Sequence, residues 1–269
     1  EFDTMYNAKQ KGVELPASLS LYEEDGSFTI ACGVSMHGET SLVLPKKNMS
    51  VRFRGAYGQS VLDYDIYGGG VTEFTNLLLR SGQDFPISII RNELSQELCA
   101  QATDKVINQR SIYCILYING EYSGIYTLKE KANEQLYAGI AGVSRDSVEV
   151  LEANVSQGSD FYKDVVEFCR FNDMSLEENY SRFCHMFDID SVIDWLILEG
   201  YCANTDLTSG NVRYCRSTEN DGKWRLMFYD LDASFSTPAS VFMNVLSEYA
   251  QQNRQFASFM VPLMDNGEF

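Results

Sequence analysis

The sequence predicts an α+β fold of two lobes, a β-rich N-terminal lobe and a mostly helical C-terminal lobe. Three observations lead to this prediction. Strand-like segments fill most of the first half, helical periodicity dominates after Glu130, and acidic segments follow a buried helix and a hairpin in the second half. With 269 residues, 45% hydrophobic and 13% aromatic, the chain is large enough for two lobes that share a cleft.

The N-terminal lobe, predicted over residues 1–130, takes its β character from runs rich in β-formers. Met49, Val51 and Phe53 alternate cleanly and are expected on one face of a strand. Asn119-Gly120 between two apolar runs is the strongest hairpin signal in the chain. The expected strands are Ser27–Met36, Met49–Arg54, Phe74–Arg80, Ser111–Ile118 and Tyr122–Leu128.

A helix is predicted over Ile87–Thr103, between the third and fourth strands of this lobe. Ile90, Leu94 and Leu98 recur at four-residue steps, which favours a helix that buries these side chains. Gly68-Gly69-Gly70 lies at no helix start, so it is interpreted as a flexible turn.

The C-terminal lobe, predicted over residues 131–269, begins with helices. Because Asp190–Ala203 is apolar on most sides, this helix is expected to be buried. A second hairpin is predicted from 212–215 and 223–229, with 217–222 as its turn. The expected helices are Asp160–Phe171, Leu176–Phe187, Asp190–Ala203 and Val241–Ala250.

The net charge of −17 argues against nucleic acid as a partner, because a surface of this sign repels phosphates. It is compatible with a basic protein or peptide, and equally with a surface that is acidic only for solubility. No apolar run is long enough to span a membrane, and no signal peptide is visible. The chain is interpreted as a piece of a longer protein, and the C-terminal lobe is expected to continue beyond it.

The seven cysteines are expected to be buried thiols that pack as small apolar groups. There is no Cys-x-x-Cys pair, so a zinc site is not predicted.

Two acidic segments carry the candidate chemistry. Asp206 is followed five residues later by Asn211, and Asp230 and Asp232 follow the second hairpin. A carboxylate can orient a hydroxyl nucleophile, while an amide and further carboxylates supply the oxygen ligands that Mg²⁺ or Mn²⁺ prefers. Taken alone, Asp206 could instead cap a turn, and Asn211 could simply begin the next strand.

The order of the elements is that of a two-lobed kinase: a small lobe with one helix, a loop after a buried helix, and an acidic strand end. Such an enzyme needs a cation near the nucleotide phosphates, and Lys47 is the candidate. Arg52 and Arg54 compete for this role, and a glutamate of the predicted helix, Glu93 or Glu97, is expected to pair with the cation.

Glu130 ends the last small-lobe strand, where a nucleotide base or ribose would be contacted; it could also be a charged linker residue.

Several segments together resemble the CotH (spore coat protein H-like) atypical protein kinases. The Asn-Gly-Glu-Tyr-x-Gly-Ile-Tyr run and the Asn-x-Asp-x₄-Asn run are the most specific. The departure is Ser236, which follows Phe235 where the family usually has Gly. The matching segments are His37–Ser41, Pro45–Arg54, Tyr57-Gly58, Leu77–Asp84, Tyr117–Glu130, Asn204–Asn211 and Tyr229–Asp232.

The resemblance implies a protein-kinase-like fold, ATP with Mg²⁺ or Mn²⁺, and phosphorylation of Ser or Thr in proteins outside the cytoplasm, at the cell or spore surface. It implies Asp206 as the catalytic residue and Asn211, Asp230 and Asp232 as metal ligands. Lys47 and Glu130 are then expected to contact ATP, and Asn204 to support the loop. The acidic charge favours a basic, Ser-rich protein substrate.

Three other functions stay open at this point. A pseudokinase or ATP-binding module would bind nucleotide without transfer. A nucleotidyl transferase would use ATP in another orientation on the same scaffold. A glycosyltransferase with Asp230-x-Asp232 as its metal motif is disfavoured, because it should show alternating βα units before the acidic pair.

Overall fold

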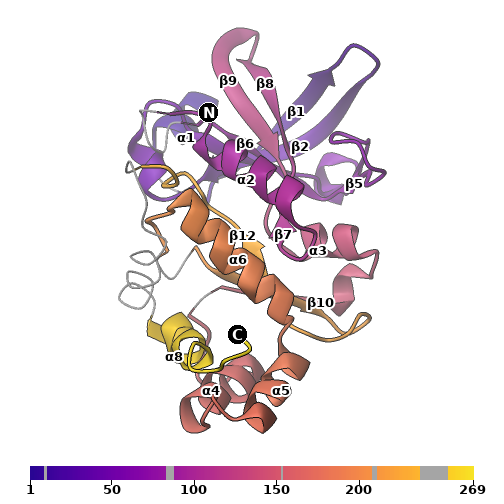
Figure 1. Ribbon diagram of the computed structural model, residues 1–269. Coiled ribbons are helices and arrows are strands. Elements are labelled where there is room, and N and C mark those ends of the chain that lie inside the picture. The colour runs from indigo at the N-terminus through magenta and orange to yellow at the C-terminus, as the bar shows by residue number, and fades with distance from the viewer. Residues whose placement is uncertain (9–10, 83–87, 153, 208–210, 237–253) are drawn as a thin grey trace. The chain divides into compact units, whose positions relative to one another are not determined.

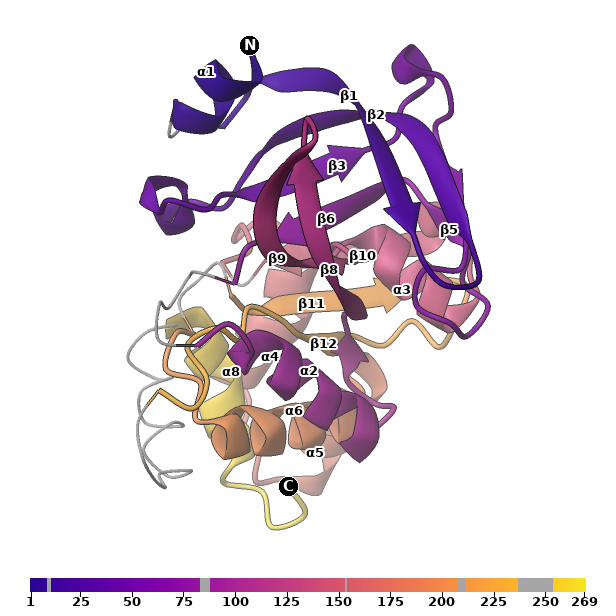
Figure 2. The same ribbon diagram turned by 90° about the horizontal axis from the view of Figure 1, so that it is seen from above.

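The computed structural model describes residues 1–8, 11–82, 88–152, 154–207, 211–236 and 254–269 (Figures 1 and 2). It is a mixed α+β structure that divides into two compact units. Unit 1 comprises Glu1–Ile90 and Gln109–Lys131, and unit 2 comprises Arg91–Asn108 and Ala132–Phe269. The predicted lobes, 1–130 and 131–269, stay a prediction; the units differ from them in that Arg91–Asn108 groups with the second unit.

Unit 1 is built on a six-stranded antiparallel sheet in the order β1-β2-β3-β6-β9-β8 (Figure 2). The Asn119-Gly120 hairpin is confirmed: both residues have positive φ, 52° and 84°, as a type I′ turn requires. The strands of this sheet are β1 (Glu14–Tyr22), β2 (Ser27–His37), β3 (Asn48–Arg52), β6 (Asn76–Arg80), β8 (Ser111–Ile118) and β9 (Glu121–Lys129).

Smaller elements complete unit 1. The predicted strand Phe74–Arg80 is divided between β5 and β6, because β5 pairs with β4 outside the large sheet. The sequence interpretation missed β1 and the N-terminal helix. These elements are α1 (Phe2–Asn7), η1 (Thr40–Val43), η2 (Gly55–Tyr57), β4 (Leu62–Asp63) and β5 (Glu73–Phe74).

The two faces of the large sheet differ in chemistry. One row across the strands is apolar and buried in the core of unit 1, namely Met36, Met49, Leu79 and Leu128. The neighbouring row points to the opposite face and is largely polar, namely Ser35, Ser50, Leu78, Lys129 and Ser111. Lys129 is only 1% exposed, so this second face holds a buried lysine.

Unit 2 contains a four-stranded sheet in the order β10-β11-β12-β7, antiparallel except for the parallel pair β12–β7. The predicted second hairpin is confirmed as β11 and β12. The strands are β7 (Ile107–Asn108), β10 (Val148–Glu152), β11 (Arg213–Ser217) and β12 (Arg225–Phe228).

Helix α6 (Ile189–Cys202) crosses this sheet and confirms the predicted buried helix. It is joined to β12 by the indole of Trp195, which donates to the Met227 carbonyl over 3.1 Å, and by Ser191 Oγ, which accepts from the Leu226 amide over 3.1 Å. Asp188 caps its first turn, and Ala203 ends it in the left-handed conformation at φ 47°.

An aromatic core in unit 2 includes Phe161, Phe183, Phe187 and Phe259 and is packed by η4, α4, α5 and α8, whereas α3 packs on a separate apolar cluster. The predicted helix Asp160–Phe171 forms with a π-helical segment at its start. The predicted helix Val241–Ala250 lies outside the described residues. The helices are α2 (Arg91–Ala102), α3 (Glu134–Ala141), η3 (Arg145–Ser147), η4 (Tyr162–Glu167), α4 (Phe168–Phe171), α5 (Glu177–Met186) and α8 (Arg254–Leu263).

The predicted helix over Ile87–Thr103 forms as α2, but its predicted buried face is wrong. Ile90 and Leu94 are 50% and 43% exposed, whereas Asn92, Ser95, Gln96 and Cys99 are buried. The buried face is polar because its amide side chains bond the backbone of a distant strand: Gln96 Nε2 donates to the Phe228 carbonyl over 2.9 Å.

The cysteine prediction is confirmed for most positions. All seven cysteines lie among the described residues and all are free thiols, five of them buried and two half-buried. Burial raises the pKa of the Cys99 thiol to about 12 and that of Cys202 to about 11, so both stay protonated at neutral pH.

Candidate functional site

Hydrogen bonds of Asn204 hold the backbone between the end of α6 and Asp206. The Asn204 amide donates to the Glu199 carbonyl over 3.3 Å, and the Asn204 side-chain oxygen accepts from the Asp206 amide over 3.3 Å. Asn204 is 1% exposed, so its side-chain oxygen, which accepts the Asp206 amide, is shielded from water. These bonds fix the backbone from which the Asp206 carboxylate extends.

Asn211 closes the same loop. Its Nδ2 donates to the Asp206 carbonyl over 3.1 Å, which fixes the orientation of the amide and therefore the position of its oxygen. Residues 208–210 between the two lie outside the described residues. The bond joins two predicted site residues directly, the candidate catalytic residue and a candidate metal ligand.

Asp230 follows β12 in an unusual backbone conformation. Its φ is 57°, in the left-handed region, where Asp is one of the few residues other than Gly that occur repeatedly. The next residue, Leu231, donates its amide to Asn92 Oδ1 of α2 over 3.1 Å. Positive φ in a non-glycine residue costs free energy and is often found at functional sites.

The two acidic segments lie close together because of the strands and loops that carry them. Arg213 pairs with Met227 at one end of the β11–β12 ladder, so the segment before β11, with Asn211, and the segment after β12, with Asp230, leave the hairpin at the same end. The segment after Asp232 is tied back to the end of α6, since the Phe235 amide donates to the Cys202 carbonyl over 2.7 Å. The structure therefore brings together the segments of Asp206, Asn211, Asp230 and Asp232 within unit 2.

The oxygen donors of these residues suit a hard cation. Carboxylates and an amide oxygen are ligands for Mg²⁺ or Mn²⁺ rather than for zinc. Within the described ranges, no group of three or more His, Cys, Asp or Glu side chains could hold a metal ion. The predicted ligands Asn211, Asp230 and Asp232 contain only two residues of these four types, because Asn211 would bind through its amide oxygen. A metal site formed by these three residues stays a prediction.

The two predicted nucleotide contacts, Lys47 and Glu130, belong to unit 1. Lys47 precedes β3 and is 4% exposed; its ammonium donates to the Leu42 carbonyl over 2.7 Å and to the Leu44 carbonyl. These bonds hold the ammonium against the η1 turn. Its role in phosphate binding stays a prediction.

Glu130 is 5% exposed, and Arg110 holds both of its carboxylate oxygens. Arg110 Nη2 donates to Oε1 over 2.8 Å and Arg110 Nε to Oε2 over 3.0 Å. The Glu130 carbonyl accepts from Gln109 Nε2 over 2.7 Å. The side chain therefore fixes the end of β9, and a nucleotide contact by this residue stays a prediction.

Lys129 is a buried basic residue that the sequence interpretation did not single out. It lies in the polar row of the large sheet with Ser50 and Ser35, whereas Lys47 contacts the carbonyls of the η1 turn. Alternation along β9 was the available signal, since Tyr126 and Leu128 are core residues and Thr127 and Lys129 must then point to the other face.

Comparison with known families identifies one match. Residues 34–154 and 141–269 match the model of a family described as CotH kinase protein. No curated protein matches the chain. No helix in the described parts of the chain is long and apolar enough to cross a membrane.

Proposed function

This chain belongs to the CotH kinase protein family, and we propose that it transfers the γ-phosphate of ATP to Ser or Thr hydroxyls of protein substrates. The family indicates a kinase-like function; the reaction and the acceptor are our proposal. The observation that carries it is the meeting of the Asp206–Asn211 loop with the Asp230–Asp232 segment at one end of β11 and β12.

Asp206 is the proposed catalytic residue. It accepts or orients the proton of the substrate hydroxyl, a task in which position matters more than basicity, because phosphoryl transfer proceeds through a loose transition state. Two hydrogen bonds to the Asp206 backbone support this position. The Asp206 amide donates to the Asn204 side-chain oxygen, and Asn211 Nδ2 donates to the Asp206 carbonyl.

Asn211, Asp230 and Asp232 are the proposed ligands of Mg²⁺ or Mn²⁺. The bound ion neutralises charge on the nucleotide phosphates. The chain's own contribution is to hold the three donors in place: Asn211 through Asp206, and the Asp230–Asp232 segment through Asn92 of α2.

Two lysines are candidates for contact with the ATP phosphates. Lys47 is the residue to which the family resemblance points, and Lys129 is favoured by its place in the polar row of the sheet. Replacing each by Met separates them: the variant that raises the KM for ATP without lowering the melting temperature identifies the phosphate contact. Glu130 is proposed to contact the nucleotide base or ribose, which then shares the Glu130 carboxylate with Arg110 or the Glu130 carbonyl with Gln109.

The proposed substrate is a basic, Ser-rich protein segment, because a chain of net charge −17 attracts cationic partners at a distance. Following the family, the proposed site of action is outside the cytoplasm, at the cell or spore surface.

Labelled ATP tests the proposal. With Mn²⁺ or Mg²⁺, label from the γ position should move to Ser or Thr of a basic Ser-rich protein. Asp206→Asn should abolish transfer and keep nucleotide binding, whereas Asp265→Asn, at an exposed position of the same unit, should keep both. Label arriving only from the α position would establish nucleotidyl transfer instead. Binding of ATP without movement of either label would establish a pseudokinase.

A further inference from the structure

The two edges of the six-stranded sheet of unit 1 are unequal. One edge is β1 and the other is β8. β1 carries features that prevent a further strand from pairing: Pro16 lacks an amide proton, and Glu14 forms ion pairs with Arg52 over 2.8 Å and Arg54 over 3.1 Å. Strand β8, Ser-Ile-Tyr-Cys-Ile-Leu-Tyr-Ile, has no charged residue and no proline.

β8 is also apolar on its solvent side. Tyr113, Ile115 and Tyr117 are 51%, 64% and 61% exposed. Opposite them on β9, Ile125 pairs with Ile115, and Tyr122 pairs with Tyr117. An uncharged edge strand with an exposed apolar face is a template on which another strand can add.

Strand β8 itself is regular along its length, because the one irregularity in its pairing lies on β9. The register with β9 shifts by one residue between Leu116 and Tyr117, where Gly124 pairs with Leu116 and Tyr122 with Tyr117. The extra residue is therefore Ser123 on the inner strand, so the irregularity does not interrupt β8 itself.

We propose that the β8 edge binds the β8 edge of a second copy of this chain, antiparallel, with the two-fold axis at Ile115. The strand is self-complementary about this residue: Ile115 faces Ile115 of the partner subunit, and Tyr113 faces the partner's Tyr117. Aromatic cross-strand pairs of this kind stabilise antiparallel sheets. An isologous contact closes after two copies.

The area of the β8 side chains sets the strength expected of this contact. With about 200 Å² for each large side chain, the exposed fractions of Tyr113, Ile115 and Tyr117 amount to roughly 350 Å² per copy. Two copies then offer about 700 Å², the size of a weak and reversible contact. Glu121 is the single charged residue in 111–128. The net charge of −17 therefore makes the two copies repel each other only at long range. Because salt screens this repulsion, salt should tighten the dimer.

Sedimentation from micromolar to hundreds of micromolar concentrations tests the proposal. We expect a reversible dimer that Ile115→Lys converts to a monomer with the melting temperature unchanged, since Ile115 is 64% exposed. The matched control is Ile125→Lys, its neighbour one strand inward and 47% exposed, which should still dimerise. A wild-type chain that is monomeric at every concentration overturns the proposal. Equal loss of the dimer in both variants also overturns it, because it would indicate that the sheets pack face to face rather than edge to edge.

Oxidative cross-linking locates the axis. Across an antiparallel pair the Cα atoms are about 4.5–5.5 Å apart, within disulfide range. Ile115→Cys should therefore give a covalent dimer under mild oxidation, whereas Ile125→Cys and the wild-type chain should not. A covalent dimer of Ile125→Cys without one of Ile115→Cys would contradict the two-fold axis at Ile115.

Discussion

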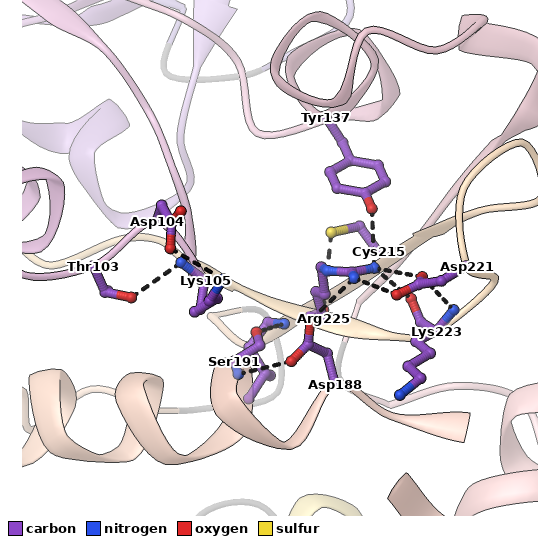
Figure 3. Close-up of polar contacts among 11 residues, drawn as sticks. Thr103, Asp104, Lys105, Tyr137, Asp188, Ser191, Cys215, Asp221, Lys223 and Arg225 are labelled. Atoms are coloured by element: carbon purple, nitrogen blue, oxygen red, sulfur yellow. Dashed lines mark hydrogen bonds and ion pairs between the residues drawn. The ribbon is translucent and has the colours of Figure 1, made fainter. Parts of the chain in front are cut away.

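Strand β12 has acidic residues at both ends, and the two ends hold them in different ways. At its start, Arg225 lies between Asp221, at 2.6 Å, and Asp188, at 3.0 Å (Figure 3). At its end, the Asp230 segment is placed through its backbone, by the Leu231 amide on Asn92 and the left-handed φ of Asp230.

This difference separates stability from function. A carboxylate bonded to a guanidinium inside the fold contributes to the free energy of unfolding. Carboxylates that surround a metal, as proposed for the Asp230 end, bring like charges close, which is favourable when a cation binds between them. Mutations at the Arg225 end should therefore lower the free energy of unfolding, and mutations at the Asp230 end should lower activity.

The largest expected effect is at Asp230. Asp230→Asn removes a charged ligand of the proposed metal site, and we expect kcat/KM to fall by about 10³-fold or more. The melting temperature should change little, because the backbone bond of Leu231 to Asn92 remains. Phosphoryl transfer and thermal unfolding measure the two quantities. A variant with normal transfer would remove Asp230 from the proposed metal site.

Arg225→Leu should have the largest effect on stability. Its side chain is 14% exposed and bonds Asp221, Asp188 and Tyr137, so two carboxylates lose their cation together. We expect a loss of about 2–3 kcal/mol in unfolding free energy, less than for a fully buried pair because Asp221 is 38% exposed.

Arg216→Leu is the matched control on β11. Its pair with Glu149 is more exposed, so we expect a loss below about 1 kcal/mol. Denaturant unfolding compares the two variants, and equal losses would show that the Arg225 network has no special role. The activity of folded Arg225→Leu should stay close to that of the wild type.

Asn92→Ala tests the link between α2 and the acidic segment. The Leu231 amide loses its acceptor, so we expect a loss of about 1–2 kcal/mol in stability and about a tenfold loss of transfer. Leu94→Ala, on the exposed face of the same helix, should change neither by a measurable amount. A larger effect at Leu94 than at Asn92 would restore the apolar face predicted from the sequence.

The smallest effect is a pH dependence at Asp221. The hydrogen bond from Arg225 holds the pKa of this carboxyl below its ordinary value of 3.8. The stabilisation is therefore complete above pH 3.8 and is lost as pH falls through the lower folded-state pKa. Asp221→Asn should be slightly less stable at neutral pH and show a shallower loss of stability below pH 3.8. An unchanged acid limb in urea unfolding would contradict this.

Local signals account for what the sequence predicted correctly. Asn119-Gly120 specifies the turn between β8 and β9 by its own backbone preferences, and the apolar pattern of α6 reflects its burial. The hairpin of β11 and β12, which separates Asn211 from Asp230 along the chain, is confirmed. That Asp206, Asn211 and Asp230 form one site stays a prediction.

Contacts between distant segments account for the failures. The buried face of α2 is polar because Gln96 and Asn92 bond residues more than a hundred positions away, which no periodicity can reveal. The ion pair of Glu130 with Arg110 joins residues twenty positions apart and was likewise not predicted from the sequence, whereas the nucleotide contact expected of Glu130 stays a prediction.

The free cysteines have a consequence for the redox conditions under which this fold is stable. All seven are reduced, and burial raises the pKa of thiols such as Cys32 and Cys169, to about 11 and about 12. The fold therefore needs no oxidant to mature and loses no cross-link to a reductant. We therefore expect the same free energy of unfolding in reducing and in non-reducing buffer.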